Sequence, residues 1–211
     1  LFYDWYRHGS FIDHFFGEDA TVDKVYKAQY PELGDFVNQP YLYINNNDEI
    51  TFYRNGYIWY NGIHTPIKVS KKFIFENNSH LITTKYLIEK TNNLEKMNIK
   101  FGVELNFSLL AGDAPDRYYI FPDNIKESTK LNSMGEIIDL NSFQIIDEWQ
   151  KIKINVECDK KFTLWRFPLE TISLSEYGFE RVYQSSVTIL KFDFDLKDSF
   201  EFEIKQTISN L

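Results

Sequence analysis

Residues 99–110 read IKFGVELNFSLL, and this stretch decides the fold. Every second position is apolar, namely Phe101, Val103, Leu105, Phe107 and Leu109. Successive side chains of a β-strand point to opposite faces of a sheet, so this alternation predicts a strand with one buried face. The other face would carry the more polar set, namely Lys100, Gly102, Glu104, Asn106 and Ser108.

The same two-residue period returns toward the C-terminal end of the chain. Its apolar members there are Ile152, Ile154, Val156, Cys158, Leu190, Phe192, Phe194, Leu196, Phe200, Phe202, Ile204 and Ile208. Such alternation is typical of antiparallel sheets, whereas parallel sheets need continuous apolar runs separated by long helices. We therefore predict an all-β fold, a large antiparallel β-sandwich that occupies residues 1–211 as a single domain.

Turn residues predict how the first half of the chain is organised. Asn55-Gly56 and Asn61-Gly62 each lie between aromatic or β-branched runs, and both pairs suit the positive φ angles of tight hairpins. The two hairpins would join the runs YLYI, ITFY, YIWY and IKVSKKFIF into a meander. We expect one or two short helices near the N-terminus, the first over residues 10–16 with Ser10 and Asp13 as a capping box.

Composition and charge exclude several classes of partner. The chain has 211 residues, 43% of them apolar and 18% aromatic, which is enough for a globular core. Its net charge of -8 would repel nucleic acid and anionic lipid, so we expect neither as a partner. No apolar stretch approaches the roughly 20 residues that span a bilayer, and no leader is recognisable. The chain does not begin with Met, which suggests an excised domain or a trimmed terminus, and we expect a cytoplasmic protein.

Motifs for metals, cofactors and nucleophiles are missing. The four histidines show no paired ligand spacing, and the single Cys158 falls on the apolar face of its run, so we predict a core thiol and no metal or cofactor. The chain has no G-x-S-x-G elbow and no G-x-G-x-x-G fingerprint. Around Arg117, the oxygen-rich loop with Asp113, Asp116 and Asp123 is interpreted as a solvated turn with an internal Arg-Asp pair. Glycosidase chemistry needs only two carboxylates a few ångströms apart, and the sequence does not exclude such a pair among the many acidic residues.

The opening segment, residues 1–16, is unusually dense in functional groups. It reads LFYDWYRHGSFIDHFF, with seven aromatic residues, two histidines, one arginine and two aspartates. Asp13 and His14 could form an acid/base pair, but neighbouring helical residues point about 100° apart, so Asp13 would not orient His14 directly. The simpler interpretation is a docking segment whose charged groups satisfy one another.

Aromatic side chains near turns and strand ends suggest a second kind of site. Tyr57, Trp59, Tyr60 and Trp165 would suit the apolar faces and polar rims of sugars. A two-sheet protein of this size also needs large side chains to fill its interior. The competing interpretation is therefore that these rings belong to the core or to hairpin packing.

Three ordered stretches carry a resemblance to a known family. They are YDWYRHGSFIDHFF (residues 3–16), FGVELNFSLLAGDAPDRYY (101–119) and FPLETISLSEYGFERVYQSS (167–186). Together they resemble the C-terminal region of the 4-α-glucanotransferases and α-amylases of glycoside hydrolase family 57. One departure is Ser185, which follows Gln184 where related chains often have glycine.

The resemblance implies a fold and a role. The fold would be similar to the galactose mutarotase-like supersandwich, and the catalytic (β/α) barrel of the family, with its nucleophile and acid, has no counterpart in this chain. The chain would then be a non-catalytic accessory domain of an enzyme that acts on α-1,4-glucan. Its expected partners are that barrel, in the same parent chain, and α-glucan or maltooligosaccharide.

The resemblance also assigns residues. Residues 1–30 would be a linker or docking segment, with Tyr3, Arg7, Asp13 and His14 at a domain interface or cleft edge. Two alternatives stay open. One is a stand-alone mutarotase- or epimerase-like enzyme that uses Glu104 with His14 or His64. The other is a structural domain that serves oligomerisation.

Overall fold

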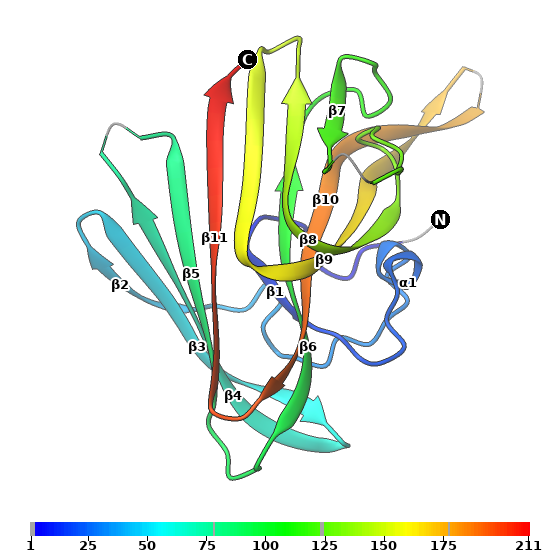
Figure 1. Ribbon diagram of the computed structural model, residues 1–211. Helices are drawn as coiled ribbons and strands as arrows, with labels where there is room; N and C mark the ends of the chain where they lie inside the picture. The colour runs from blue at the N-terminus through cyan, green and yellow to red at the C-terminus, as the bar shows by residue number, and fades with distance from the viewer. Residues whose placement is uncertain (1–2, 78, 123–124, 177) are drawn as a thin grey trace.

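The computed structural model of the protein describes residues 3–77, 79–122, 125–176 and 178–211 (Figure 1). The first half of the chain forms β1 (Ile12–Phe15), α1 (Val22–Tyr26), β2 (Leu42–Asn46), β3 (Glu49–Tyr60), β4 (Ile63–Phe75), β5 (Leu81–Lys90) and β6 (Met97–Phe107). The second half forms β7 (Arg117–Ile120), β8 (Gly135–Asp147), β9 (Ile152–Ser175), β10 (Gly178–Leu196) and β11 (Ser199–Asn210).

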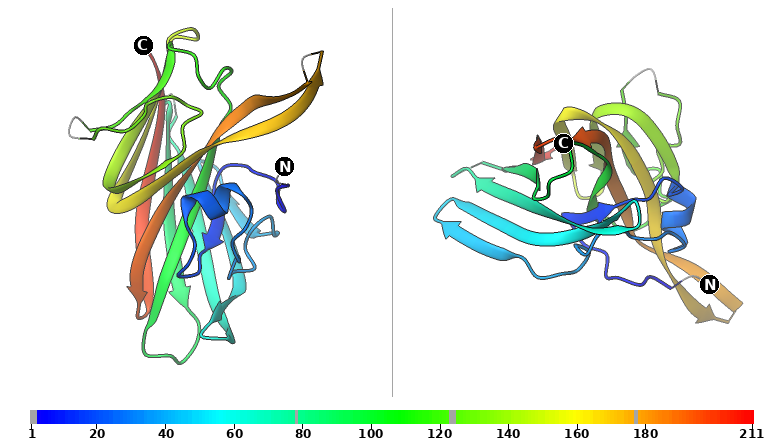
Figure 2. Two further views of the ribbon diagram at one scale, coloured as in Figure 1. Left: turned by 90° about the vertical axis from the view of Figure 1, so that its right-hand side faces the viewer. Right: turned by 90° about the horizontal axis from the view of Figure 1, so that it is seen from below.

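The strands form one continuous antiparallel sheet that curls back on itself. Along its main path the order is β1-β6-β10-β9-β11-β5-β4-β3-β2, and β7 joins through β8, which pairs with β9. The long strand β9 links the two layers because it changes neighbours along its length. Residues 152–158 of β9 pair with β11, whereas residues 163–175 pair with β10. The views in Figure 2 show the sheet curving around this strand.

The main core lies between the two faces of the curled sheet. Phe101 of β6 has its ring centroid 6.0 Å from that of Tyr86 of β5, although these strands are not neighbours in the sheet. Phe192 of β10 likewise lies 4.3 Å from Phe202 of β11, on the far side of β9. Rings therefore pack from one layer onto the other, and the predicted β-sandwich is confirmed.

The period-two prediction matches burial along the strands. The buried members are Phe101, Val103, Leu105, Leu109, Ile154, Val156, Cys158, Leu190, Phe192, Leu196, Phe202 and Ile204. Burial raises the pKa of the Cys158 thiol to about 12, so the predicted core thiol is confirmed. Ile208 is exposed, because it lies beyond the last β11 residue that pairs with β5.

One of the two predicted hairpins is wrong. Asn61-Gly62 does form the turn between β3 and β4, with positive φ angles of 50° and 76°. Asn55 and Gly56 instead continue β3, where they pair with Lys68 and Ile67 of β4. A Cβ atom at Gly56 would lie 2.6 Å from the Phe36 ring, so this glycine makes room for a neighbouring segment rather than for a turn.

The predicted helix over residues 10–16 is also wrong. Residues 12–15 form β1, which pairs with residues 101–104 of β6, so partner strands override the local capping pattern. The short helix near the N-terminus is α1 instead. Its cap is Thr21, whose hydroxyl accepts a hydrogen bond from the Lys24 amide at 3.3 Å.

The loop around Arg117 is less solvated than predicted. Arg117 begins β7 and is buried, and its guanidinium pairs with Asp116 at 3.0 Å and with the fully buried Asp147 at 3.2 Å. The predicted Arg-Asp pair is present, but the second partner comes from β8, thirty residues away. Asp123 lies outside the described residues.

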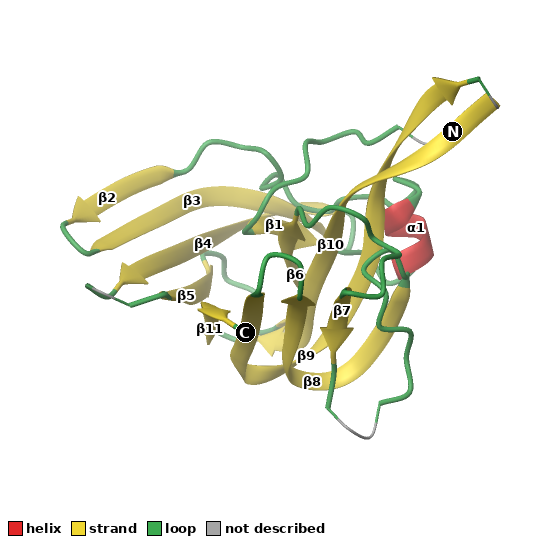
Figure 3. Cartoon of the chain, turned by 90° about the horizontal axis from the view of Figure 1, so that it is seen from above, coloured by secondary structure: helices red, strands yellow, loops and turns green. Residues whose placement is uncertain are grey.

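A two-stranded arm projects from the body of the sandwich. It consists of residues 169–175 of β9 and 178–185 of β10, which pair with each other beyond the points where β8 and β6 accompany these strands. Figure 3 shows the arm extending away from the remaining strands, on the same side as the N-terminus and α1.

Candidate functional site

The opening segment is attached to the sandwich by a buried set of ionisable side chains, which we call the Glu104 network. Glu104 of β6 accepts a hydrogen bond from the Tyr6 hydroxyl at 2.6 Å. Its carboxylate also lies 2.9 Å from His8 Nδ1 and 3.1 Å from His14 Nε2. Glu32 holds the other ring nitrogen of His14, Nδ1, at 3.0 Å. Three residues of the opening segment therefore converge on one carboxylate.

The histidines and Glu104 shift one another's pKa values. Burial lowers the pKa of His14, but hydrogen bonds to Glu104 and Glu32, together with their negative charges, outweigh burial and raise it to about 9. Burial also lowers the pKa of His8, but hydrogen bonds to Asp4 and Glu104 and their negative charges raise it to about 9. Burial would raise the pKa of Glu104, yet the two histidines lower it to about 2. At neutral pH the network is a charged, mutually paired cluster.

This ionisation predicts how stability depends on pH. Groups whose pKa rises from 6.5 to about 9 on folding stabilise the protein fully below pH 6.5 and lose that contribution as pH rises through 9. The contribution of Glu104 is present above pH 4.5 and is lost as pH falls through 2. We expect each of the two histidines to lower the free energy of unfolding by on the order of 3 kcal/mol between pH 6.5 and 9.

Urea unfolding at a series of pH values measures this dependence. The His14→Gln variant should reduce the alkaline decline to about half, because His8 keeps its own raised pKa, whereas His80→Gln, which removes an exposed histidine, should leave the decline unchanged. A wild-type profile that is level from pH 6.5 to 9 would show that the histidines are not protonated in the folded protein.

A second buried ion pair lies on the other side of β1. Lys71 of β4 places Nζ 2.9 Å from the Asp13 carboxylate and 2.5 Å from the Phe11 carbonyl oxygen. The hydroxyl of Tyr86 donates to Asp13 at 3.0 Å, and that of Tyr41 donates to the same carboxylate. Asp13 and His14 therefore point to opposite faces of β1 and belong to two separate networks, so they do not form an acid/base pair.

The structure divides the four predicted interface residues into two groups. Tyr3 and Arg7 are exposed, whereas Asp13 and His14 are buried inside the sandwich. The buried pair fixes the opening segment onto β6 and β4, and the exposed pair faces outward. Sequence reasoning missed Tyr6, His8 and Glu32 as partners, because nothing local in their spacing shows that Tyr6 and His8 contact Glu104 or that Glu32 contacts His14.

The structure brings together only two of the three residues that the stand-alone enzyme hypothesis requires. Glu104 and His14 do lie together, but both are fully buried and already paired. His64 lies elsewhere, where its ring stacks on Tyr57 at 4.3 Å. A general base works best with a pKa near the operating pH, and Glu104 is far below that range. The cluster is suited to holding the opening segment.

The predicted sugar-binding aromatics also separate into groups. Tyr57 and Trp59 are 43% and 55% exposed on one face of β3, and with His64 they form what we call the aromatic platform. Tyr60 is half-buried, and its hydroxyl accepts a hydrogen bond from the Asn98 amide at 3.1 Å. Trp165 is 2% exposed in a second core cluster, where its indole N–H donates to Glu136.

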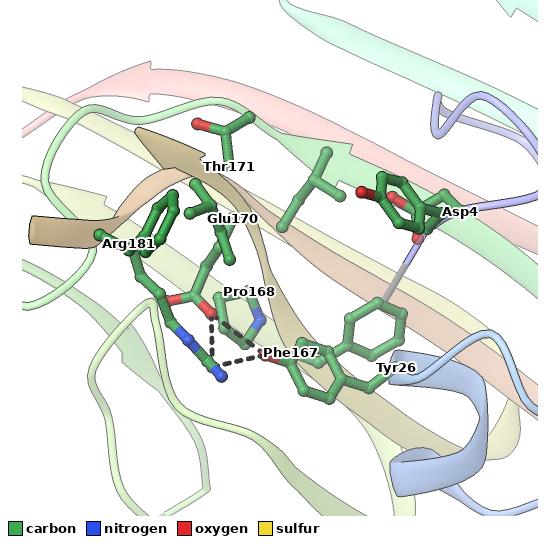
Figure 4. A pocket seen from close by; sticks show the side chains of 11 residues that line it. Asp4, Tyr26, Phe167, Pro168, Glu170, Thr171 and Arg181 are labelled. Carbon is green, nitrogen blue, oxygen red and sulfur yellow. Dashed lines mark hydrogen bonds and ion pairs between the residues drawn. The ribbon is translucent and has the colours of Figure 1, made fainter. Parts of the chain in front are cut away.

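A groove of about 440 Å³ separates the arm from the start of the chain. Tyr3 and Asp4 form one wall, Tyr26 of α1 closes the base, and the opposite wall comes from residues 167–172 of β9 with Phe179 and Arg181 of β10. Figure 4 shows that Arg181, Glu170 and Tyr26 form a polar cluster within it. The Tyr26 hydroxyl donates to Glu170 at 3.1 Å, and Arg181 lies 3.4 Å from the same carboxylate.

In the part of the chain that the structure describes, no group of three or more His, Cys, Asp and Glu side chains is arranged to hold a metal ion. Among the same residues, no helix is long and apolar enough to cross a bilayer.

Comparison with known proteins relates the whole chain to one family. The family model described as alpha-amylase/4-alpha-glucanotransferase, C-terminal, matches residues 1–206. Alpha-amylase 1 of Dictyoglomus thermophilum is 31% identical over 198 residues, which cover 93% of this chain and 27% of that protein. The 4-alpha-glucanotransferase of Thermococcus litoralis is 29% identical over 206 residues, which cover 97% of this chain and 27% of that protein. The chain thus spans about a quarter of the length of these relatives.

Solved structures agree on the fold. The crystal structure of the Thermococcus litoralis 4-alpha-glucanotransferase matches with a TM-score of 0.76 at 26% identity, covering 98% of this chain and 28% of that chain. A galactose mutarotase related enzyme from Lactobacillus acidophilus matches with a TM-score of 0.57 at 11% identity, covering 93% and 78%. The second match concerns the fold alone, and it confirms the predicted supersandwich.

Proposed function

The chain belongs to the family of alpha-amylase/4-alpha-glucanotransferase C-terminal domains, and from this premise we propose that it is a non-catalytic accessory domain that braces the catalytic domain of an α-1,4-glucan-acting enzyme. The observation that carries the proposal is coverage. The match runs over nearly all of this chain but only 27% of each relative, under a family description that names the C-terminal part.

The geometry of the opening segment supports a bracing role. The Glu104 network and the Asp13–Lys71 pair hold this segment rigidly on β6 and β4, while Tyr3 and Arg7 face outward. Domains that must keep a fixed relative position need a stiff junction rather than a flexible linker. We also propose a cytoplasmic location for the enzyme, with which the buried free thiol of Cys158 is compatible.

Removing the domain from the longer enzyme tests the bracing role. Amylose-directed activity should decay at least about tenfold faster at elevated temperature without residues 1–211, because the exposed interface of the catalytic domain loses its cover. Circular dichroism at low temperature checks that the catalytic domain still folds. Equal half-lives of the two proteins would contradict bracing.

We further propose that the aromatic platform contacts α-glucan. Tyr57 and Trp59 are two residues apart on one strand face, about 7 Å, so two flat rings are presented side by side to an extended ligand. Their apolar faces suit the apolar faces of sugar rings, and the stacked His64 offers a polar edge. The names of the relatives make α-glucan the ligand to test.

Titration of the chain with maltooligosaccharide, followed by NMR, tests this contact. We expect saturable shifts at residues 57–64, and Trp59→Ala should weaken binding about fivefold, because an aromatic face contributes about 1 kcal/mol. Trp149→Ala removes an even more exposed tryptophan from the turn after β8 and should have no effect. No shift at millimolar ligand would leave only the bracing role.

A further inference from the structure

The arm is a two-stranded ribbon that carries large apolar side chains into solvent. Leu174 and Phe179 are directly opposite each other in the ladder, and their side chains are 76% and 82% exposed. An isolated two-stranded hairpin is at best marginally stable in water. Exposed apolar patches of this kind mark interaction surfaces.

The two faces of the arm differ in chemistry. Pairing and alternation place Leu174, Phe179 and Ile172 on the same face as Arg181 and Glu170. This is the face that lines the groove, since Ile172, Phe179, Arg181 and Glu170 all belong to the groove wall. The opposite face carries Ser173, Glu180 and Val182, which are not among the residues that line the groove, and Thr171, which is. The apolar side of the arm is therefore continuous with the groove.

The groove is also lined by residues close to the start of the family match. Tyr3 and Asp4 form its other wall, and Asp4 lies 3.3 Å from His8 of the Glu104 network. In a protein whose C-terminal part this chain forms, the preceding polypeptide enters through these residues. About three quarters of each relative lies outside the matched region, so a body larger than this chain has to be accommodated beside that entry point.

We propose that the apolar face of the arm, together with the groove, is the surface on which the catalytic domain of the same enzyme docks. This inference rests on the proposed function. The apolar pair Leu174–Phe179, which lies near the tip of the arm, provides the main apolar contact of the interface. Toward the base, the Arg181–Glu170–Tyr26 cluster supplies polar groups that are already oriented by one another and need little reordering on docking.

The test compares matched variants in the longer enzyme. The double substitution Leu174→Ser, Phe179→Ser should shorten the half-life of amylose-directed activity by about tenfold or more, because two large apolar contacts are lost at the centre of the interface. Val182→Ser, which changes an apolar residue on the opposite face of the arm, should change the half-life less than twofold. In the 211-residue chain alone, the double variant should unfold at the same urea concentration as the wild type, because both side chains are exposed.

Hydrogen exchange gives a readout that does not depend on activity. Amides of residues 171–174 and 179–182 should exchange at least about tenfold more slowly in the longer enzyme than in the 211-residue chain. Equal exchange, with an unchanged half-life for the double variant, would overturn the inference even if removal of the whole domain still destabilised the enzyme. If removal of the domain had no effect, the proposed function itself would fail.

Other occupants of the surface produce different results. A dimer of the 211-residue chain that dissociates in the Leu174→Ser, Phe179→Ser variant would show that a second copy covers the arm, and would overturn the proposal. Shifts of the arm resonances on addition of maltooligosaccharide to the chain alone would assign the groove to glucan and would overturn it as well.

Discussion

Glu104→Gln is expected to lower the free energy of unfolding by about 3–5 kcal/mol, because the change removes the negative charge that three groups of the opening segment share. The amide of glutamine keeps the shape but cannot accept a hydrogen bond at both ends. His14 would then keep only Glu32 as a negative partner, and His8 only Asp4, so each buried cation is less well compensated or has to lose its proton, and both outcomes cost free energy.

Equilibrium unfolding in urea, followed by tryptophan fluorescence, measures this loss. Glu201→Gln is the matched control, because Glu201 is exposed on β11 and its replacement should change stability by less than about 0.5 kcal/mol. A second readout separates the electrostatic effect from simple packing damage. In Glu104→Gln the pKa of both histidines should drop, so the alkaline decline in stability should move to lower pH. A loss below 1 kcal/mol with an unchanged pH profile would contradict the assignment of Glu104 as the centre of the network.

Lys71→Met is expected to have the second large effect, also about 3–5 kcal/mol, because it leaves the Asp13 carboxylate buried without its cation. Methionine fills a volume similar to the lysine stem, so the loss reports the charge more than the packing. The hydroxyls of Tyr41 and Tyr86 still donate to Asp13, which keeps the loss from exceeding this range.

Two further variants test whether the loss comes from the Lys71–Asp13 pair. Lys85→Met removes a lysine whose side chain is 56% exposed beside Glu203, and should cost less than about 1 kcal/mol. Combining Lys71→Met with Asp13→Asn should cost clearly less than the sum of the two single changes, since the pair is then removed as a unit. Strict additivity in the urea midpoints would show that Lys71 and Asp13 are not coupled.

The strand pattern of this chain was readable from local sequence because the alternation of side chains is a local property. In β6 the apolar positions were predicted one by one, and the same holds for Val156 in β9 and Ile204 in β11. The turn at Asn61-Gly62 was equally local, since both residues adopt positive φ angles there. Asn55-Gly56 has the same two-residue signal and was misread, because the Phe36 ring that occupies the space above Gly56 comes from a distant segment.

The candidate sites depended much more on tertiary structure. A signal for Lys71 does exist in the sequence, because it interrupts the apolar series Ile67, Val69, Phe73 on one face of β4. No comparable signal marks Glu104, which occupies an ordinary polar position of β6 and is buried only because the opening segment covers that face. Trp165 and Trp59 are both flanked by strand residues, yet one is in the core and the other is exposed.

By itself, the sequence determined that this protein is an antiparallel β-sandwich, and through its three ordered motifs it determined the family. Both follow from features that lie within one strand or one continuous stretch, where neighbouring residues carry the information. Only the tertiary structure decided which polar residues are buried, which aromatic rings reach solvent and where the arm presents its apolar face. Those outcomes depend on segments about 30 to 100 residues apart coming into contact, as Glu104 does with His8, 96 residues away, and a local pattern does not encode such contacts.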